Sequence, residues 1–330
     1  MNTPHNDVIL DQFTRQAAPF ANAAPIRNDD LLRRIVELAE AQADDRVLDI
    51  ACGPGLVACA FAHVVQQATG IDLTPAMLEQ AGRLQEQQAL HNVTWTLGDV
   101  TSLPYRDRQF SIVTSRFAFH HLPEPRAALK EMLRVCQPGG RIVVADSAPA
   151  VLKAGAFNGM ERLRDPSHTR ALPPEELRGL FAQEGVAPRI EMYRLPGDLE
   201  DLLARSFPEP GDADRIRKIF EASLQDDPLD MATRRENGRI AYAFPIAIVS
   251  AVVGSSQRTE RGKSFVIHMT AFSALRTDAI IFLAVRVCPD RLSATRRPGV
   301  GATRLFFERE SNETVHYTRA VRGHRLGGTR

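Results

Sequence analysis

The sequence predicts an α/β fold, in which a seven-stranded, mostly parallel sheet carries helices on both faces and is joined by a small helical lid. Two observations predict this fold. Between Arg46 and Asp146, short β-branched or apolar runs alternate with longer amphipathic stretches, as strands and crossover helices do. A glycine-containing turn, Gly53-Pro54-Gly55, directly follows the first of these runs, where the first crossover helix of such a sheet begins.

Five apolar runs predict the parallel strands, and the stretches between them carry apolar residues at the three- and four-residue spacing of helices. The predicted strands are RVLDIA (46–51), ATGID (68–72), VTWTL (93–97), FSIVTS (110–115) and RIVVAD (141–146). The predicted helices are LVACAFAHVVQ (56–66), PAMLEQAGRLQEQQAL (75–90) and EPRAALKEMLRVC (124–136). Thr74 before Pro75 is typical of a helix start, and we expect Pro138-Gly139-Gly140 to end the third helix.

Outside this core the sequence predicts further helices at 29–42 and 173–184, and strands at 189–195 and 239–252 that complete the sheet. Residues 197–228 read as two polar helices broken by prolines and a glycine, which we assign to a lid or substrate wall. The predicted division is an N-terminal helical lid at 1–45, the main domain at 46–252 with that insertion, and a basic C-terminal extension at 253–330.

Charge is distributed unevenly along the chain. Residues 251–330 hold 14 Lys and Arg against 6 Asp and Glu, whereas residues 1–250 hold 27 against 34. An acidic main domain argues against a nucleic-acid groove, which needs clustered basic side chains. The basic tail could contact an anionic partner, but a poorly ordered extension without a role is the interpretation we favour.

The cysteines and the chain's N-terminus indicate an intracellular protein. Cys52, Cys59, Cys136 and Cys288 show no spacing that suits zinc, so we expect reduced thiols and no metal. No secretory signal is visible, and the longest apolar run, 244–254, is too short to span a bilayer and fits a buried strand. The expected location is the cytoplasm, and a homodimer is left open.

The glycine turn alone fits two cofactors, because Gly53-x-Gly55-x-x-Ala58 also matches the dinucleotide pattern. Asp49 distinguishes between these two cofactors. It lies near the end of the first predicted strand, where its carboxylate would repel a pyrophosphate but would attract a cation. The ammonium and sulfonium of S-adenosylmethionine are such cations, so the residues favour this cofactor.

Two more carboxylates follow the next two predicted strands. Asp72 lies 17 residues beyond Gly55, where a carboxylate can accept hydrogen bonds from both ribose hydroxyls. Asp99 could accept from an adenine amino group while Val100 packs on the ring. Each Asp alone could instead cap a helix or a turn. Three at successive strand ends outline a nucleoside without phosphates.

The runs RVLDIACGPG (46–55), GIDLTPAML (70–78) and GDVTSLPYRDRQFSIVTSRFAFHHLPEPRAALKEMLRVCQPGGRIVVAD (98–146) resemble the class I S-adenosylmethionine-dependent methyltransferases, in particular the group similar to the ubiquinone/menaquinone C-methyltransferase. This resemblance covers about residues 10–252 and implies a Rossmann-like domain, methyl transfer and S-adenosylmethionine as cofactor. It implies a lid over the cofactor formed by Phe13, Gln16 and Phe20. It also implies a cofactor pocket lined by Asp49, Ala51, Gly53, Gly55, Asp72, Leu73, Met77, Asp99, Val100, Arg116 and Phe117.

Histidines on the acceptor side are the candidates for catalysis. Methyl transfer chiefly needs donor and acceptor held in line, and a general base is needed when the acceptor must lose a proton. His120 and His121 follow the fourth predicted strand, and His168 lies in an expected loop beyond the fifth. Imidazole titrates near neutral pH, so these are the base candidates, although each could be purely structural. Arg164 and Asp165 are expected to lock that loop.

The sequence therefore predicts an S-adenosylmethionine-dependent methyltransferase that acts on a small molecule. A quinone-like, aromatic or heterocyclic acceptor is expected, methylated at carbon, nitrogen or oxygen. Two alternatives remain at this point, which are an NAD-dependent oxidoreductase and a non-catalytic module that binds S-adenosylmethionine.

Overall fold

A computed structural model describes residues 4–254, 284–285, 308–309 and 315–316. The chain divides into two compact units, 1–256 and 257–330. In the second unit the described residues are three short antiparallel strands in the order β10-β11-β9, namely β9 (Ala284–Val285), β10 (Glu308–Arg309) and β11 (Val315–His316). The rest of the predicted extension beyond residue 254 lies outside the described residues, and the predicted division of the chain stays a prediction.

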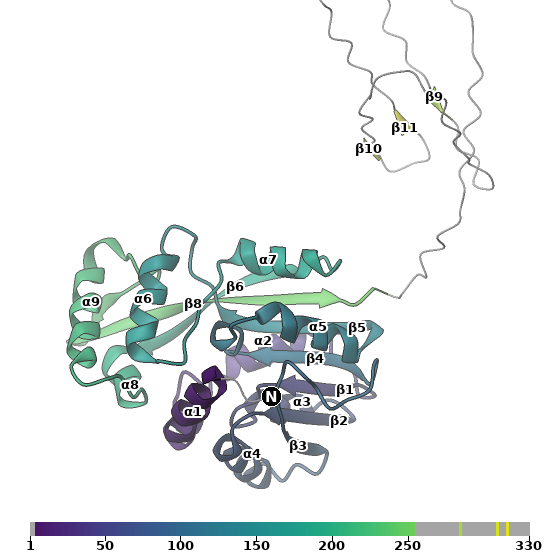
Figure 1. Ribbon diagram of the computed structural model, residues 1–330, viewed down its shortest axis with the longest axis horizontal. Helices are drawn as coiled ribbons and strands as arrows, with labels where there is room; N and C mark the ends of the chain where they lie inside the picture. Colours follow the sequence, from purple (N-terminus) through teal and green to yellow (C-terminus); the bar gives the residue numbers. More distant parts are fainter. Residues whose placement is uncertain (1–3, 255–283, 286–307, 310–314, 317–330) are drawn as a thin grey trace, which may run out of the picture. The chain divides into compact units, whose positions relative to one another are not determined.

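The first unit is built on one twisted sheet in the strand order β3-β2-β1-β4-β5-β8-β6 (Figure 1). Neighbours from β3 to β5 pair in parallel, whereas β8 runs antiparallel to both β5 and β6. These strands are β1 (Arg46–Ile50), β2 (Gln67–Asp72), β3 (Val93–Leu97), β4 (Phe110–Arg116), β5 (Cys136–Ser147), β6 (Arg189–Asp198) and β8 (Arg239–Val252). A short eighth strand, β7 (Arg234–Glu236), pairs with β8. The predicted seven-stranded, mostly parallel sheet is confirmed.

Two apolar cores cover the two faces of this sheet. Along β1 the side chains alternate, so that Val47 belongs to one core and Leu48 to the other, both fully buried. Helices α2 and α3 supply the first core and helices α5 and α7 supply the second, while α4 packs beside α3 and β3. The helices are α2 (Asp29–Leu38), α3 (Leu56–Ala62), α4 (Pro75–Gln87), α5 (Pro125–Val135) and α7 (Pro174–Gln183).

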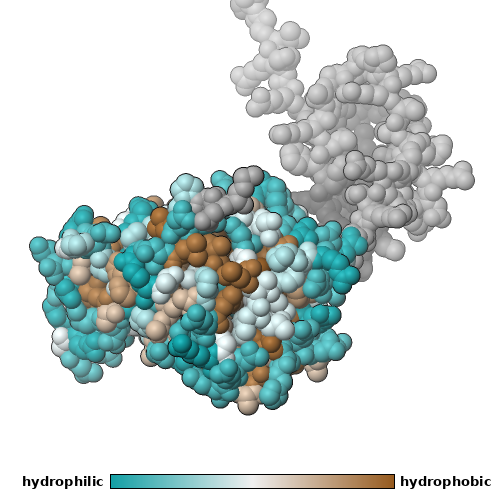
Figure 2. All heavy atoms as spheres, turned by 60° about the horizontal axis from the view of Figure 1, so that its bottom comes forward, coloured by the Kyte–Doolittle hydropathy of each residue, from teal (hydrophilic) through white to brown (hydrophobic). Residues whose placement is uncertain are grey.

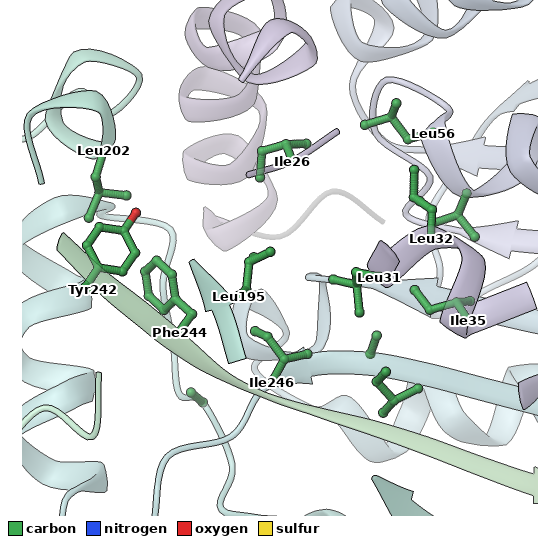
Figure 3. Close-up of a cluster of buried hydrophobic side chains, with 14 of the residues drawn as sticks. Ile26, Leu31, Leu32, Ile35, Leu56, Leu195, Leu202, Tyr242, Phe244 and Ile246 are labelled. Carbon is green, nitrogen blue, oxygen red and sulfur yellow. The ribbon is translucent and has the colours of Figure 1, made fainter. Parts of the chain in front are cut away.

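The remaining helices gather at the carboxyl ends of the parallel strands, to the left in Figure 1. They are α1 (Pro4–Asn22), α6 (Ala154–Arg164), α8 (Leu199–Ala204) and α9 (Asp212–Asp226). The long strand β8 extends into this group, and its alternate side chains Tyr242, Phe244 and Ile246 point toward α8 and β6 (Figure 3). Ring contacts of Phe244 with Tyr242 and with Phe157 of α6 join these elements. The end of the sheet that ligands would approach is thus walled by helices.

One expectation about local structure was wrong. Helix α5 ends at Val135, and Pro138-Gly139-Gly140 lies within β5 instead of ending the helix. Residues 154–164, for which the sequence predicted no helix, form α6. Gly155 and Gly159 lower the helix propensity of this stretch, but Phe157 and Met160 are almost fully buried and stabilise it by packing.

Hydrophobic side chains also form a band across the face that comes forward in Figure 2, bordered by hydrophilic ones.

None of the helices within the described ranges combines the length and the apolar character that a membrane crossing requires.

Candidate functional site

The turn after β1 surrounds the carboxylate of Asp72, and Asp72 is the last residue of β2. The Gly53 amide donates to Oδ2 of Asp72 over 2.8 Å, and the Thr74 amide donates to Oδ1 over 2.8 Å. The Cys52 amide donates to the Ile71 carbonyl over 3.0 Å. These bonds fix the first turn on the second strand, so that the ends of β1 and β2 form one rigid edge.

Gly55 is required for close packing behind this turn. Its φ is +81°, and a Cβ added there would lie 2.5 Å from the Trp95 ring and 2.9 Å from the Ala81 Cβ. Left-handed strain and overpacking together cost about 2–5 kcal/mol, so we expect Gly55→Ala to lower the free energy of unfolding by that amount. Chemical denaturation measures the change.

Gly82→Ala is the matched control, because Gly82 lies in the same helix as Ala81 and a Cβ there meets nothing within 4 Å. A gain of about 0.5–1 kcal/mol is expected for it, since alanine favours helix more than glycine does. Equal stability of Gly55→Ala and the native chain would contradict the packing described here.

Asp49 is buried at the end of β1 with one carboxylate oxygen unused. Oδ2 accepts from the Ala58 amide in the first turn of α3 over 3.2 Å, whereas Oδ1 has no hydrogen-bond partner among the described residues. Burial raises the pKa of Asp49 to about 8, and nearby Arg116 only partly opposes this. A buried, unsatisfied carboxylate oxygen indicates that a donor or cation belongs beside it.

Asp99 follows β3 and is held in a turn by its own neighbours. Its Oδ1 accepts from the amide and the hydroxyl of Thr101, and its Oδ2 accepts from Nδ2 of Asn6 over 3.0 Å. Burial would raise the pKa of Asp99, but these bonds outweigh it and the pKa is lowered. The carboxylate is thus ionised and ready to accept a further hydrogen bond.

These strand ends surround a first cavity. The structure brings most of the predicted cofactor residues to its wall, together with one of the predicted catalytic residues. They are Phe13, Phe20, Asp49, Ala51, Gly53, Asp72, Leu73, Met77, Asp99, Val100, Arg116, Phe117 and His121. Eight further wall residues were not among the predicted site residues, although some belong to the turn and strand end that the sequence had indicated; they are Asn6, Ile9, Cys52, Pro54, Val57, Thr74, Ala118 and Leu122.

Two non-glycine residues of this wall adopt left-handed backbone conformations. Ala51, after β1, has a φ of 49°, and Phe117, after β4, has a φ of 57°. Such conformations cost on the order of 1–3 kcal/mol and concentrate at functional sites. Arg116, beside Phe117, donates to the Ile26 carbonyl over 2.9 Å, and burial lowers its pKa to about 10. The strand ends therefore present a cation, Arg116, close to a carboxyl group, Asp49, whose pKa is raised to about 8.

A second cavity of about 640 Å³ adjoins the first. Four residues line both cavities, namely Phe13, Phe20, Phe117 and His121. The rest of the second wall comes from Gln16, Pro25, Ile26, His120, Ser147, Glu161, Arg164, Asp165, Leu195, Leu202, Arg205, Phe244 and Ile246. Two small molecules bound side by side would meet at the shared residues.

His120 is held in one orientation by Asp146 at the end of β5. Its Nδ1 bonds to Oδ1 of Asp146, and the carboxylate also accepts the amides of Phe119 and Ser147 over 2.7 and 2.6 Å. Nε2 has no hydrogen-bond partner among the described residues, and His120 lines the second cavity. Burial alone would lower the pKa of His120, but the Asp146 carboxylate outweighs it and raises the pKa.

His121 belongs to a different hydrogen-bond chain. The Ser167 hydroxyl donates to Oδ1 of Asp165 over 2.6 Å, so it accepts from Nδ1 of His121 over 3.0 Å. Burial, with a contribution from His120, lowers the pKa of His121 to about 3. His121 is therefore neutral, and it is a weaker base than His120.

The structure does not bring His168 to either cavity wall. Its Nε2 bonds to Oδ1 of Asn158 over 2.7 Å, and its ring lies 5.4 Å from that of His120. Burial lowers the pKa of His168. The expected pairing of Arg164 with Asp165 is also not formed as a hydrogen bond, because Arg164 makes two bonds to Glu161.

Helix α1 is bonded to residues of both cavities. Asn6 in its first turn contacts Asp99, and Gln16 three turns later donates to Oδ2 of Asp165 over 3.1 Å. Gln16, which was expected over the cofactor, thus lies at the second cavity. Within the described ranges, no group of three or more His, Cys, Asp or Glu side chains is arranged to hold a metal ion. Cys52, Cys59 and Cys136 are buried free thiols.

Three neighbouring strand ends carrying Asp49, Asp72 and Asp99, together with a glycine turn, are typical of α/β proteins that bind a nucleoside. Comparison with known proteins gives the family. Residues 48–144 match the family described as a methyltransferase domain. The uncharacterized methyltransferase YcgJ of Bacillus subtilis is 30% identical over 246 residues, which cover 73% of this chain and 97% of that protein.

The crystal structure of YcgJ superposes with a TM-score of 0.64 at 28% identity, covering 69% of this chain and 99% of that one. A putative methyltransferase from Bacillus halodurans gives 0.62 at 26% identity, covering 68% and 98%. The ubiquinone/menaquinone biosynthesis C-methyltransferase UbiE of Bdellovibrio bacteriovorus is 30% identical over 44% of this chain and 64% of that protein. The chain belongs to the S-adenosylmethionine-dependent methyltransferase family, as the sequence predicted, and S-adenosylmethionine is the cofactor of that family.

Proposed function

We propose that this chain methylates a small molecule bound in the second cavity, with S-adenosylmethionine in the first. The shared wall of Phe13, Phe20, Phe117 and His121 carries this proposal, because it lets a donor and an acceptor approach each other away from bulk water. S-adenosylmethionine supplies an electrophilic methyl group bonded to a positively charged sulfur.

The residues of the first cavity fit this cofactor. Asp72 would accept the ribose hydroxyls, and Asp99 with Val100 would receive the adenine. Arg116 is a cation that suits the carboxylate of an amino acid, and Asp49, once it releases its proton, suits the ammonium. The unpartnered Oδ1 of Asp49 supports this assignment, because a bound ammonium or sulfonium would satisfy it.

On the acceptor side we assign the general base to His120. The Asp146 carboxylate holds its Nδ1 proton, so Nε2 keeps a lone pair that can take a proton from an acceptor hydroxyl or acidic carbon. Aromatic side chains of the second cavity, among them Phe13 and Phe244, suit a flat ring. A quinone-like, aromatic or heterocyclic acceptor is therefore proposed, and the similarity to a relative named as a quinone C-methyltransferase supports it.

The two alternatives are less well supported. Nothing in the described turn cradles a pyrophosphate, since Asp49 and Asp72 face the site where its charge would lie. A module that only binds the cofactor would need no acceptor space, whereas a second cavity adjoins the first.

Two measurements test the proposal. Calorimetric titration with S-adenosylhomocysteine should show binding, and titration with NADH should show none. A screen of metabolite extracts with an isotope-labelled methyl donor should then yield a labelled small molecule. Binding of NADH, or an absence of S-adenosylhomocysteine binding, would contradict the proposal.

Cofactor binding should depend on pH through Asp49. Since burial raises its pKa to about 8, the free protein carries this proton below that pH, and a bound cation favours its release. The affinity for S-adenosylmethionine should therefore rise by at most tenfold per pH unit between about pH 6 and 8. Above about pH 8 this rise should end. Calorimetry at pH 7 in buffers of different ionisation enthalpy measures the released proton.

Asp49→Asn is the control for this experiment, because the ligand's own amino group also titrates near pH 8. Proton release should fall in this variant by the share that belongs to Asp49. Identical proton release by Asp49→Asn and the native chain would remove the role assigned to this carboxylate.

A further inference from the structure

Arg205, at the C-terminal end of α8, is a buried cation that faces the second cavity without a carboxylate partner. Its side chain is only 8% exposed. Nη1 donates to the Asp201 carbonyl over 3.0 Å, and Nη2 donates to the Tyr242 hydroxyl over 3.2 Å. None of the described residues forms an ion pair with it. A buried charge without a counter-charge is costly, so an anion is expected beside it.

The acidic groups nearby are already engaged. Glu161 accepts two hydrogen bonds from Arg164, over 2.9 and 2.7 Å. The carboxylate of Asp201 bonds to Arg239 over 2.8 Å. Glu161 is therefore paired with Arg164, and Asp201 shares Arg239 with Asp198, so neither carboxylate is paired with Arg205.

Asp165 is satisfied without Arg205 as well. Its two oxygens accept from the Ser167 amide and hydroxyl and from Gln16, over 2.9, 2.6 and 3.1 Å. Burial would raise its pKa, but Arg164 and the hydrogen bonds from Ser167 and Gln16 outweigh it and lower the pKa, so Asp165 stays ionised. Asp146 is occupied by His120. Of the two arginines on the cavity wall, Arg205 alone lacks an acidic partner in the described part of the chain.

Apolar side chains surround the space next to Arg205. Leu202 lies over Tyr242 and Phe244, with Leu195 and Ile246 further along β6 and β8 (Figure 3). This wall suits an apolar ring, and the guanidinium suits a planar anion, which it can bind through two parallel hydrogen bonds.

We propose that the acceptor is an aromatic acid, whose carboxylate pairs with Arg205 while its ring lies on the apolar wall of the same cavity. The inference rests on the proposed function, which makes this cavity the acceptor site. It narrows the acceptor from flat rings in general to rings that carry an acidic substituent.

The test compares acids with their uncharged amides. The probes are 4-hydroxybenzoate and 6-hydroxy-2-naphthoate, each against its carboxamide, titrated into the full chain with S-adenosylhomocysteine present at pH 7.5. Ligand-observed NMR or calorimetry gives the dissociation constants. At least one acid should bind ten or more times as tightly as its amide, because only the acid carries the charge that Arg205 can pair with.

Three variants test whether Arg205 causes the preference for the acid over its amide. Arg205→Met removes the charge but keeps a side chain of similar length, so it should abolish the preference for the acid. Arg205→Lys keeps a positive charge and should keep part of that preference. Arg217→Met is the matched control, since Arg217 is exposed on α9 and pairs with Glu200, so the preference should stay unchanged. Affinity for S-adenosylhomocysteine and thermal unfolding check that each variant folds.

Equal binding of acid and amide by the native chain, or a preference that survives in Arg205→Met, would overturn the inference, as would the absence of binding by both acids. The comparison of acid with amide on the native chain can overturn the inference even if Arg205→Met does not fold. Failure of S-adenosylhomocysteine to bind would instead refute the proposed function, so the two failures are distinguishable.

Discussion

Replacing His120 by Gln should lower kcat by about 10²–10⁴-fold while leaving the affinity for S-adenosylhomocysteine unchanged, because general-base catalysis contributes this much when the acceptor must lose a proton. Gln keeps a side-chain amide near Asp146 but has no basic nitrogen. The measurement uses the acceptor that the labelled-donor screen identifies, with single-turnover rates to separate the methyl transfer from product release.

The pH dependence gives a second signature of the same residue. The base must be unprotonated, and the Asp146 carboxylate raises the pKa of His120 despite its burial. In the native chain kcat should therefore rise with pH through that raised pKa. The dependence should disappear in His120→Gln.

His168→Gln is the matched control, since His168 belongs to the same group of rings but lines neither cavity. Its kcat should stay within about threefold of the native value, a change below 1 kcal/mol. Activity that survives in His120→Gln but is lost in His121→Gln would move the base to the neighbouring residue. Activity that survives in both would show that the acceptor needs no base.

The second large effect is expected at Asp72. Asp72→Ala should weaken S-adenosylhomocysteine binding by about 1.5–3 kcal/mol, or roughly 10- to 150-fold, because charge-assisted hydrogen bonds to the ribose are lost. The substitution also leaves the Gly53 and Thr74 amides without their acceptor, which loosens the turn. Calorimetry measures the affinity.

Asp44→Ala serves as the control, since Asp44 is exposed just before β1 and should not affect binding. Thermal unfolding of Asp72→Ala separates a loosened turn from the loss of ribose contacts: a folded variant with weak binding supports the assignment. Affinity within twofold of the native value would remove Asp72 from the cofactor site.

Sequence reasoning located the first cavity because parallel strands end at the same edge of a sheet. Asp49 and Asp72 lie at the ends of strands that could be recognised from their apolar runs, Asp99 follows a third such strand, and the topology then places the three together. The sequence alone therefore predicted that carboxyl groups gather at the carboxyl edge of the sheet, without any knowledge of how the helices pack.

The second cavity could not be assembled in the same way. Glu161 and Arg205 belong to α6 and α8, and the placement of these helices depends on contacts such as Phe157 with Phe244, far apart in the chain. Arg205 looks in the sequence like any surface arginine. Only the packing of Tyr242 and Leu202 around it shows that it is buried and lacks a carboxylate.

The two cavities are also built from different parts of the chain. Strand ends from β1 to β4 supply most of the first, whereas α6, α8 and β8 contribute only to the second. Under the proposed function, exchange of the peripheral helices would change the acceptor, while the strand ends that receive the methyl donor would stay the same. Among relatives that differ in these helices, sequence similarity in the strand region is a guide to donor chemistry and says little about which molecule is modified.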